Sequence, residues 1–209
     1  MAFEEVGEKR YQLEETSNKI VISIPSQKNW FIILFLGFWL IGWAVGEVSV
    51  IGILSAGIFG LFSNSLPGIT ESVPGAFGGV FLIAWLGGWT VGGAFAIYTW
   101  LWQVKGFERI SISFDAFVIE KLTPIWRRKK EYHLKDVVSL RISNSSPSMF
   151  TMSGSMEFWG ISGGRLAFDY GAKTVQFGSG IDEAEAKFLI KDIEKKHPKI
   201  VEMNDHGVN

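Results

Sequence analysis

A 75-residue stretch with almost no charge constrains the fold of this chain more than any other feature. Residues 30–104 contain no Lys, Arg, Asp or His, and their only charged side chains are Glu47 and Glu71. The hydrocarbon core of a bilayer is about 30 Å thick, and roughly 20 apolar helical residues cross it. The sequence therefore predicts a membrane α-helical hairpin, with spans at about 30–50 and 80–104 and an outer loop between them.

Basic residues flank this stretch on both sides and are absent between the two spans. Four precede the first span and seven lie between positions 105 and 130, whereas residues 47–79 contain none. Cytoplasmic segments next to membrane spans are enriched in Lys and Arg. We therefore expect a multi-pass protein with both termini in the cytoplasm. The apolar segment 48–62 then extends the first span or lies as a helix at the outer interface.

The rest of the chain has an ordinary composition. The 209 residues carry a net charge of −1 and include no Cys. These values exclude a strongly basic nucleic-acid-binding domain, a disulfide framework and a Cys-ligated metal site. The three His also lack partners at metal-ligand spacing. We expect no cofactor and no metal, and we expect the partners to be membrane lipids and other membrane proteins or further copies of this chain, with no nucleic acid.

Two segments within the apolar stretch resemble each other. Residues 35–46 and 81–92 are identical at eight of twelve positions, and each segment ends in GWxVG. The GxxxG spacing places two glycines on one helix face, where another backbone can come close. The alternative is that the match reflects only the composition common to membrane spans. We predict a close helix crossing, within the hairpin or between protomers, at Gly42, Gly46, Gly88 and Gly92.

Seven of the nine Trp lie in the same stretch. Tryptophan is enriched at both membrane–water interfaces, where its ring is apolar and its N–H is polar. This predicts interfacial anchors on both sides of the membrane. Those on the cytoplasmic side would be Trp30, Trp100 and Trp102, and those on the outer side Trp43, Trp85 and Trp89.

The N-terminal segment 1–29 has too few apolar residues for a core of its own. Residues 11–15 and 19–25 alternate between apolar and polar side chains as short strands do. The segment therefore forms a small β-hairpin that packs on the cytoplasmic domain or near the headgroups, or it is a disordered tail.

After residue 104 the pattern changes to short alternating segments that end in a helix. Alternation of apolar and polar residues predicts strands. The helix begins at Asp182, which has capping-box spacing to Glu185, and Pro198 follows its end. We assign residues 105–198 to a cytoplasmic α+β, mainly β, domain and residues 199–209 to a tail. The expected strands are about seven and antiparallel, at 108–114, 117–122, 125–134, 137–143, 155–159, 165–170 and 174–177.

Seven strands closed by one C-terminal helix is the order of a pleckstrin-homology-like (PH-like) module. The segments FWGISGGRLAFDYGAKTVQFGSGIDEAEAK, at 158–187, and IPSQKNWFIILFLGFWLIGWAVGE, at 24–47, resemble those of a family of bacterial two-span membrane proteins with a PH-like C-terminal domain. The two segments cover about a quarter of the chain. The resemblance implies a PH-like fold and a bacterial inner (cytoplasmic) membrane location, and it brings no assigned activity and no functional residues.

A run of four basic residues is the best candidate contact surface in the soluble part. In a strand, Arg127 and Lys129 point to one side and Arg128 and Lys130 to the other. Near a membrane, each such residue attracts anionic lipid by about 1 kcal/mol. The equally weighted alternative is a solvated edge strand that its charge protects from pairing.

These features favour a protein that is not an enzyme. We expect an inner-membrane scaffold, assembly factor or accessory subunit whose hairpin anchors a cytoplasmic PH-like interaction domain. The alternative from another class is an oligomeric transporter or channel component with Glu47 near its mouth, because acids at membrane depth are functional suspects. A hydrolase is a third hypothesis, and it requires a deep polar pocket in the soluble domain.

Overall fold

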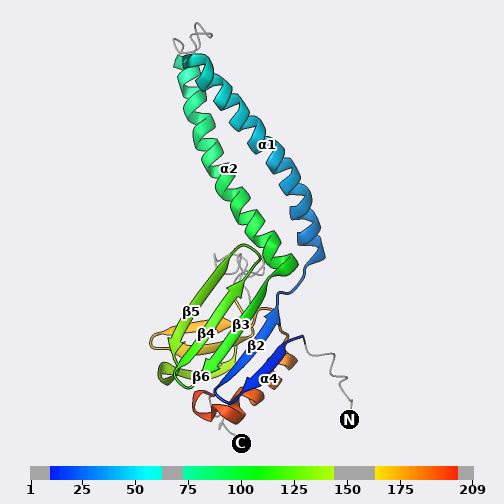
Figure 1. Cartoon of the computed structure of the whole chain (residues 1–209), viewed down its shortest axis with the longest axis vertical. Helices are drawn as coiled ribbons and strands as arrows, with labels where there is room; N and C mark the ends of the chain where they lie inside the picture. The colour runs from blue at the N-terminus through cyan, green and yellow to red at the C-terminus, as the bar shows by residue number, and fades with distance from the viewer. Residues whose placement is uncertain (1–9, 63–72, 144–162, 202–209) are drawn as a thin grey trace, which may run out of the picture. The chain divides into compact units, whose positions relative to one another are not determined.

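The computed structural model contains two long helices, two β-sheets and a C-terminal helix (Figure 1). It describes residues 10–62, 73–143 and 163–201. The expected loop at the outer ends of the helices and the expected strand at 155–159 lie, wholly or in large part, outside these residues.

The chain divides into two compact units. One unit consists of Trp30–Trp100, and the other combines Met1–Asn29 with Leu101–Asn209. The β-rich unit is therefore assembled from both sides of the apolar stretch. This differs from the expected domain of residues 105–198, which leaves the N-terminal segment out.

The helical unit is longer than the sequence predicts. Helix α1 covers Trp30–Phe62 and helix α2 covers Val73–Lys105, with 33 residues each. Segment 48–62 thus extends the first helix. Both helices are long and apolar enough to span a membrane, and only 11 % of their most apolar windows is buried. The core helix of a soluble protein would bury most of its apolar side chains, whereas these helices expose most of theirs.

Indole rings join the two helices. Trp43 Nε1 donates a hydrogen bond to the carbonyl of Trp89 at 3.0 Å, and Trp100 Nε1 donates one to the carbonyl of Ile33 at 3.1 Å. The ring of Trp85 stacks on that of Trp89 with centroids 5.6 Å apart. Trp43 and Trp89 lie near the middle of their helices. That Trp43, Trp85 and Trp89 are outer interfacial anchors stays a prediction.

The close approach between the helices occurs at a glycine outside the GxxxG pairs. A Cβ atom added at Gly93 would lie 2.0 to 2.4 Å from ring atoms of Trp43, whereas one added at Gly46 would lie 3.8 Å from the ring of Trp89. The intrachain version of the predicted crossing is therefore wrong for three of its four glycines. A Cβ atom would meet nothing within 4 Å at Gly42, Gly88 and Gly92.

The larger sheet has five antiparallel strands in the order β1-β2-β3-β4-β5. β-Branched residues alternate with polar ones in the central strands, so one face of the sheet is buried. The first two strands come from the N-terminal segment, which forms the expected hairpin and joins the sheet through β2. The strands are β1 Gln12–Thr16, β2 Lys19–Pro25, β3 Phe107–Ser113, β4 Ala116–Leu122 and β5 Arg127–His133.

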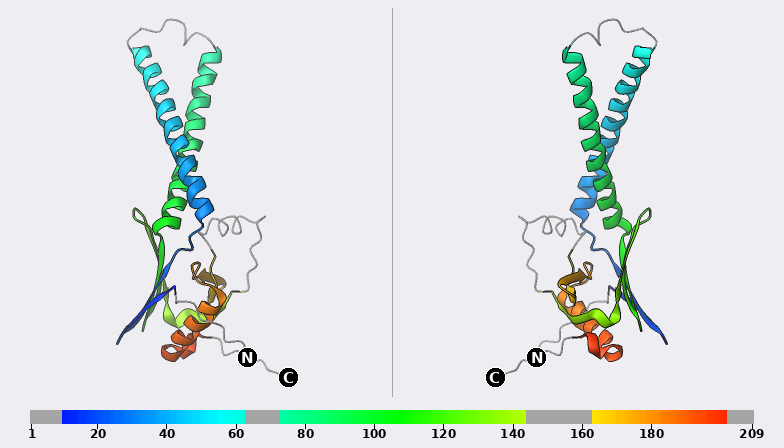
Figure 2. Two further views of the ribbon diagram at one scale, coloured as in Figure 1. Left: turned by 90° about the vertical axis from the view of Figure 1, so that its right-hand side faces the viewer. Right: turned by 90° about the vertical axis from the view of Figure 1, so that its left-hand side faces the viewer.

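The smaller sheet and the last helix close the domain. Strands β6 Val137–Ile142, β7 Leu166–Tyr170 and β8 Lys173–Phe177 form an antiparallel sheet, and α4 covers Glu183–Lys196. Asp182 and Glu185 make the predicted capping box at the start of α4. Figure 2 shows β7, β8 and α4 on one side of the larger sheet.

A single core joins both sheets and α4. Ile22 and Ile110 come from the larger sheet, Phe168 from the smaller one and Leu189 from α4, and all four are fully buried. The rings of Phe117 and Phe168 pack with centroids 4.8 Å apart across the two sheets. Burial of each such side chain contributes about 1.5–3 kcal/mol, so the two sheets and α4 depend on one another for stability.

The described part of the chain contains eight strands, six of them after the helices, where the sequence predicted seven. The predicted strand 125–134 is shortened at both ends, because residues 123–126 form a turn. The expected tail also begins too early. Ile200 is 4 % exposed, and Val201 forms a bridge with Leu140 of β6.

The contact at Gly93 predicts the effect of a single added methyl group. Gly93→Ala should displace the Trp43 ring and break its hydrogen bond to Trp89, lowering the free energy of unfolding by about 1–3 kcal/mol. Thermal unfolding of the full-length protein in detergent measures this. Gly92→Ala is the matched control, since a methyl group there meets nothing within 4 Å. Equal stability of the two variants would contradict the contact.

Candidate functional site

The two connections between the helices and the sheet form one junction. β2 ends at Pro25 and α1 begins at Trp30, whereas α2 ends at Lys105 and β3 begins at Phe107. In the register of the sheet, Pro25 pairs with Phe107. The residues before and after the helical pair are therefore neighbours on adjacent strands.

Hydrogen bonds within the β-rich unit fasten the two connections together. The amide of Ser26 donates to the carbonyl of Gly106 at 3.0 Å, and Ser26 Oγ donates to the carbonyl of Trp102 at 2.7 Å. The amide of Asn29 donates to Gln103 Oε1 at 3.1 Å. Ser26 and Gln103 are both buried. Buried hydrogen bonds of this kind are costly to leave unmade, so the junction is held by more than chain connectivity.

Trp102 belongs to this junction and does not have the location expected of an interfacial anchor. Its side chain is 1 % exposed. Lys121 Nζ lies 5.4 Å from the centroid of its ring, within the range of a cation–π interaction. The indole is thus used to pack the last turn of α2 onto β4, and the sequence prediction for Trp102 is wrong because protein covers the ring.

A buried carboxylate lies two residues beyond the junction. Glu108 is 1 % exposed and occupies the inward-facing phase of β3 together with Ile110 and Ile112. Its Oε2 accepts hydrogen bonds from the amides of Gly178, at 2.9 Å, and Ser179, at 3.3 Å. Its Oε1 has no hydrogen-bond partner among the described residues.

Burial controls the ionisation of this carboxylate and of the lysine beside it. Desolvation raises the pKa of Glu108, while Lys121 and the amides of Gly178 and Ser179 act to lower it. Desolvation lowers the pKa of Lys121, against which Glu108 acts to raise it. The two residues face each other in the register of β3 and β4. Burial thus disfavours the charge on both residues, and the charge of each partner opposes this effect on the other.

The pair holds the loop that precedes α4. A Cβ atom added at Gly180 would lie 2.0 Å from the carbonyl oxygen of Pro25, so the loop packs directly on the end of β2. Glu108 is hydrogen-bonded to this loop and lies one strand away from Pro25. The arrangement connects the last helix of the domain to the strands that lead into the apolar helices.

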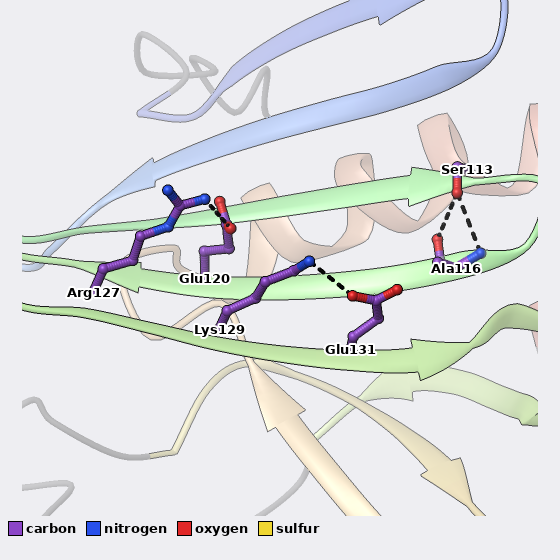
Figure 3. A network of polar contacts seen from close by, with 6 residues as sticks. All are labelled: Ser113, Ala116, Glu120, Arg127, Lys129 and Glu131. Atoms are coloured by element: carbon purple, nitrogen blue, oxygen red, sulfur yellow. Dashed lines mark hydrogen bonds and ion pairs between the residues drawn. The ribbon is translucent and has the colours of Figure 1, made fainter.

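The basic strand β5 lies at the edge of the larger sheet, next to β4. On one face, Arg127 forms an ion pair with Glu120, and Lys129 Nζ lies 2.7 Å from Glu131 Oε2 (Figure 3). All four basic residues of the strand are exposed. Half of the predicted cationic run is therefore paired with acids of the same sheet.

The other two cations lie on the opposite face of β5. Arg128 is opposite Lys121 and Lys130 is opposite Ile119. Tyr132, in the same phase, packs its ring against Phe168 in the core. Among the described residues neither Arg128 nor Lys130 has an ion-pair partner. The predicted alternation of the four cations is present, and it leaves two of them available to an anionic surface.

The β-rich unit has a cavity of about 490 Å³, which lies at the end of β3 away from the junction. No acidic side chain and no Ser, Thr or Cys is among the described residues that line it. The hydrolase hypothesis, which requires a polar pocket with a nucleophile, therefore finds no support at this cavity. Its lining consists of Phe114, Leu134, Lys135, Val137, Val138, Lys196, His197, Pro198, Lys199 and Ile200.

Glu47 lies inside the helical unit. Helix α1 continues for 15 residues beyond it. Its Oε1 accepts a hydrogen bond from Thr90 Oγ1 at 2.6 Å, and its Oε2 has no hydrogen-bond partner in the described part of the chain. A carboxylate at this depth is costly in lipid and is a candidate functional group.

Sequence reasoning missed the junction residues. Glu108 could have been found, because the alternation FERISIS places it in phase with two buried isoleucines. Ser26 and Gln103 carry no such signal. Their role depends on the pairing of two strands that are separated by more than 80 residues in the sequence.

The hydrogen bonds of Glu108 predict a stability difference between two substitutions. Glu108→Ala removes the acceptor of two buried amides and should lower the free energy of unfolding by about 1–3 kcal/mol. Glu108→Gln keeps an acceptor oxygen, so it should lower the free energy of unfolding by less. Denaturant unfolding of the full-length protein in detergent distinguishes them, and equal losses would show that the amides of Gly178 and Ser179 do not depend on this side chain.

The raised pKa of Glu108 also predicts a pH dependence. The unfolded chain releases this proton near pH 4.5, the ordinary value, whereas the folded protein retains it to higher pH. The stability contributed by the proton is full below pH 4.5 and declines as the pH rises through the raised pKa. The stability of the wild type relative to Glu108→Gln should therefore fall as the pH rises above 4.5, and a constant difference would contradict the shift.

Comparisons with known proteins found no match. No model of a known protein family matches it, and neither the curated proteins nor the solved structures that were searched contain a match. The function must therefore be argued from the geometry described above.

Proposed function

We propose that this protein is a non-enzymatic scaffold, assembly factor or accessory subunit of a membrane complex. In this proposal α1 and α2 anchor the chain in a bacterial inner membrane, and the β-rich unit is an interaction domain in the cytoplasm. The observation that carries the proposal is the insertion of the two apolar helices between the paired strands β2 and β3.

This insertion favours an anchor for a physical reason. A domain attached by one flexible linker can move freely relative to the membrane. Here four residues connect β2 to α1 and one residue connects α2 to β3. The hydrogen bonds of Ser26 and Asn29 hold these connections to each other. Such an arrangement makes both connections short and holds them to each other, which favours an anchor over a freely moving tether.

The order of elements supports the PH-like part of the proposal. Strands β2–β8 followed by α4 have the number and order of a PH-like module, with β1 and the helical pair as additions. Two edges of the larger sheet, β1 and β5, are available to partners. In this proposal the cations of β5, at 127–130, contact anionic lipid or a partner protein.

A second function is favoured by one observation in the helices. The hydrogen bond between Thr90 and Glu47 places an acid between the apolar helices, as in proton or ion pathways. Two helices per chain supply few pore-lining groups. A transporter or channel would therefore need several copies of the chain in a closed ring.

The proposed topology predicts which side of the membrane each part faces. The chain has no Cys, so single cysteines report unambiguously. A membrane-impermeant maleimide should label Ser65→Cys in intact cells and label Lys173→Cys only after the membrane is disrupted. Lys19→Cys should behave like Lys173→Cys because both residues belong to the β-rich unit. Labelling of positions 65 and 173 from the same side would exclude two crossings.

The assembly state separates the two functions. The tagged full-length chain, extracted from its own membranes in mild detergent, should migrate in a complex with other membrane proteins. Glu47→Gln should leave this complex intact, because a scaffold does not use the carboxylate. A ring of identical copies would favour the transporter instead, and a free monomer would contradict both.

A further inference from the structure

The turn between β4 and β5 exposes two large apolar side chains in a fixed conformation. The amide of Thr123 donates to the carbonyl of Trp126 at 2.8 Å, and the amide of Trp126 donates to Thr123 Oγ1 at 3.0 Å. Ile125 is nevertheless 71 % exposed and Trp126 63 % exposed. Single exposed apolar residues are common in proteins. Here two of them lie together on a turn that its own hydrogen bonds hold in place.

The register of the sheet puts this turn at the end of the strands where the chain leaves for and returns from the helices. 'Edge' below means this end of the sheet. Phe107 pairs with Leu122, which pairs with Arg127, and the turn lies between the last two. Phe107 follows Lys105, the end of α2, by two positions. Consecutive Cα atoms are 3.8 Å apart, so this edge of the sheet begins within about 8 Å of the end of α2.

The length of α2 relates this edge to the membrane surface, given the membrane placement of the proposed function. Its apolar part, Gly78–Lys105, contains 28 residues. At 1.5 Å per residue the segment is about 42 Å long, close to the 40–45 Å thickness of a bilayer with its headgroups. The end of α2 therefore lies at the headgroup level, and so does the adjoining edge of the sheet.

The charges beside the turn match an anionic membrane surface. Arg128 and Lys130 are exposed on one face of β5 and have no ion-pair partner among the described residues, whereas Arg127 and Lys129 are paired with acids. Basic residues near an anionic bilayer contribute about 1 kcal/mol each to membrane attraction. Tryptophan is also the residue that most favours the membrane–water interface.

We infer that Ile125 and Trp126 insert into the headgroup region of the leaflet that contains the end of α2, with Arg128 and Lys130 bound to anionic lipid headgroups. The inference rests on the proposed function, because it requires α2 to cross the membrane. The turn becomes a third attachment beside the two chain connections. Three attachments fix which face of the sheet is turned to the cytoplasm.

The same sheet supplies an internal control. Phe114 follows β3 at the opposite end of the strand and is 72 % exposed. Seven strand residues, or about 23 Å, separate it from the edge that carries the turn. Phe114 is an apolar side chain as exposed as Ile125. It differs in its position on the sheet and in lying away from the cations Arg128 and Lys130.

The test uses the full-length protein in vesicles, with one cysteine carrying an environment-sensitive NBD fluorophore. Ile125→Cys, Phe114→Cys and Val91→Cys place the label at the turn, at the control site and within α2. The vesicles contain phosphatidylcholine alone or phosphatidylcholine mixed with phosphatidylglycerol, and lipids with spin-labelled chains serve as quenchers. We expect position 125 to be blue-shifted and quenched in the anionic vesicles, and position 114 to remain in water in both.

Removal of the two cations tests how much they contribute to insertion of the turn. Arg128→Gln together with Lys130→Gln should lower the equilibrium constant for insertion of the turn by about thirty-fold, which corresponds to two charges at about 1 kcal/mol each. Trp126→Ala should also weaken quenching at position 125, because it removes the indole that would enter the interface. The turn itself should persist, since the backbone amide and carbonyl of residue 126, which hold it, are retained. Quenching that is equal in neutral and anionic vesicles would overturn the role of the two cations.

The label in α2 separates failure of this inference from failure of the proposed function. If position 91 is quenched while position 125 behaves like position 114, the turn does not insert although the helices do. If position 91 is not quenched, the membrane placement itself is wrong. A label at position 126 in place of 125 repeats the measurement on the neighbouring residue, so the result does not depend on one variant.

Discussion

The pairing of β2 with β3 is the interaction on which the rest of this protein depends. These strands lie on either side of the two apolar helices, yet Lys19–Pro25 and Phe107–Ser113 are hydrogen-bonded neighbours in one sheet. The N-terminal segment alone cannot bury a core, and the C-terminal segment alone lacks two strands of the sheet. Folding of the β-rich unit therefore requires both ends of the helical pair to return to one place.

The apolar side chains of the two units have different surroundings. Apolar side chains of the β-rich unit are buried among both sheets and α4, where removal from water supplies the driving force. The helices keep most of their apolar side chains at their surface, where water would be unfavourable and lipid is not. Their mutual contacts are correspondingly specific and few, and they rely on indole N–H groups and on the space left by Gly93.

Several buried polar groups of the β-rich unit lie at or next to its connections to the helices. Glu108, Gln103 and Ser26 are all buried there, in a region that Lys121 also lines. Burying such groups costs free energy unless hydrogen bonds or opposite charges compensate. Their concentration at one edge gives this part of the domain a geometry that an apolar packing would not specify.

The amino-acid sequence by itself determined the elements that have a strong period or an extreme composition. The two helices follow from the near absence of charge between Trp30 and Val104, and the capping box of α4 follows from the spacing of Asp182 and Glu185. Alternation was sufficient to find most strands, because a side-chain period of two is visible locally. It also showed that the four cations of β5 divide between two faces.

Only the tertiary structure decided which distant residues meet. It made the N-terminal hairpin part of the sheet, placed the ring of Trp43 against Gly93 and not against a GxxxG glycine, and buried Trp102 where an interfacial anchor was expected. It also placed Ile125 and Trp126 in a turn at the edge of the sheet next to α2. Each of these outcomes depends on contacts between segments far apart in the chain. A local pattern of residues does not identify the distant segment that it contacts.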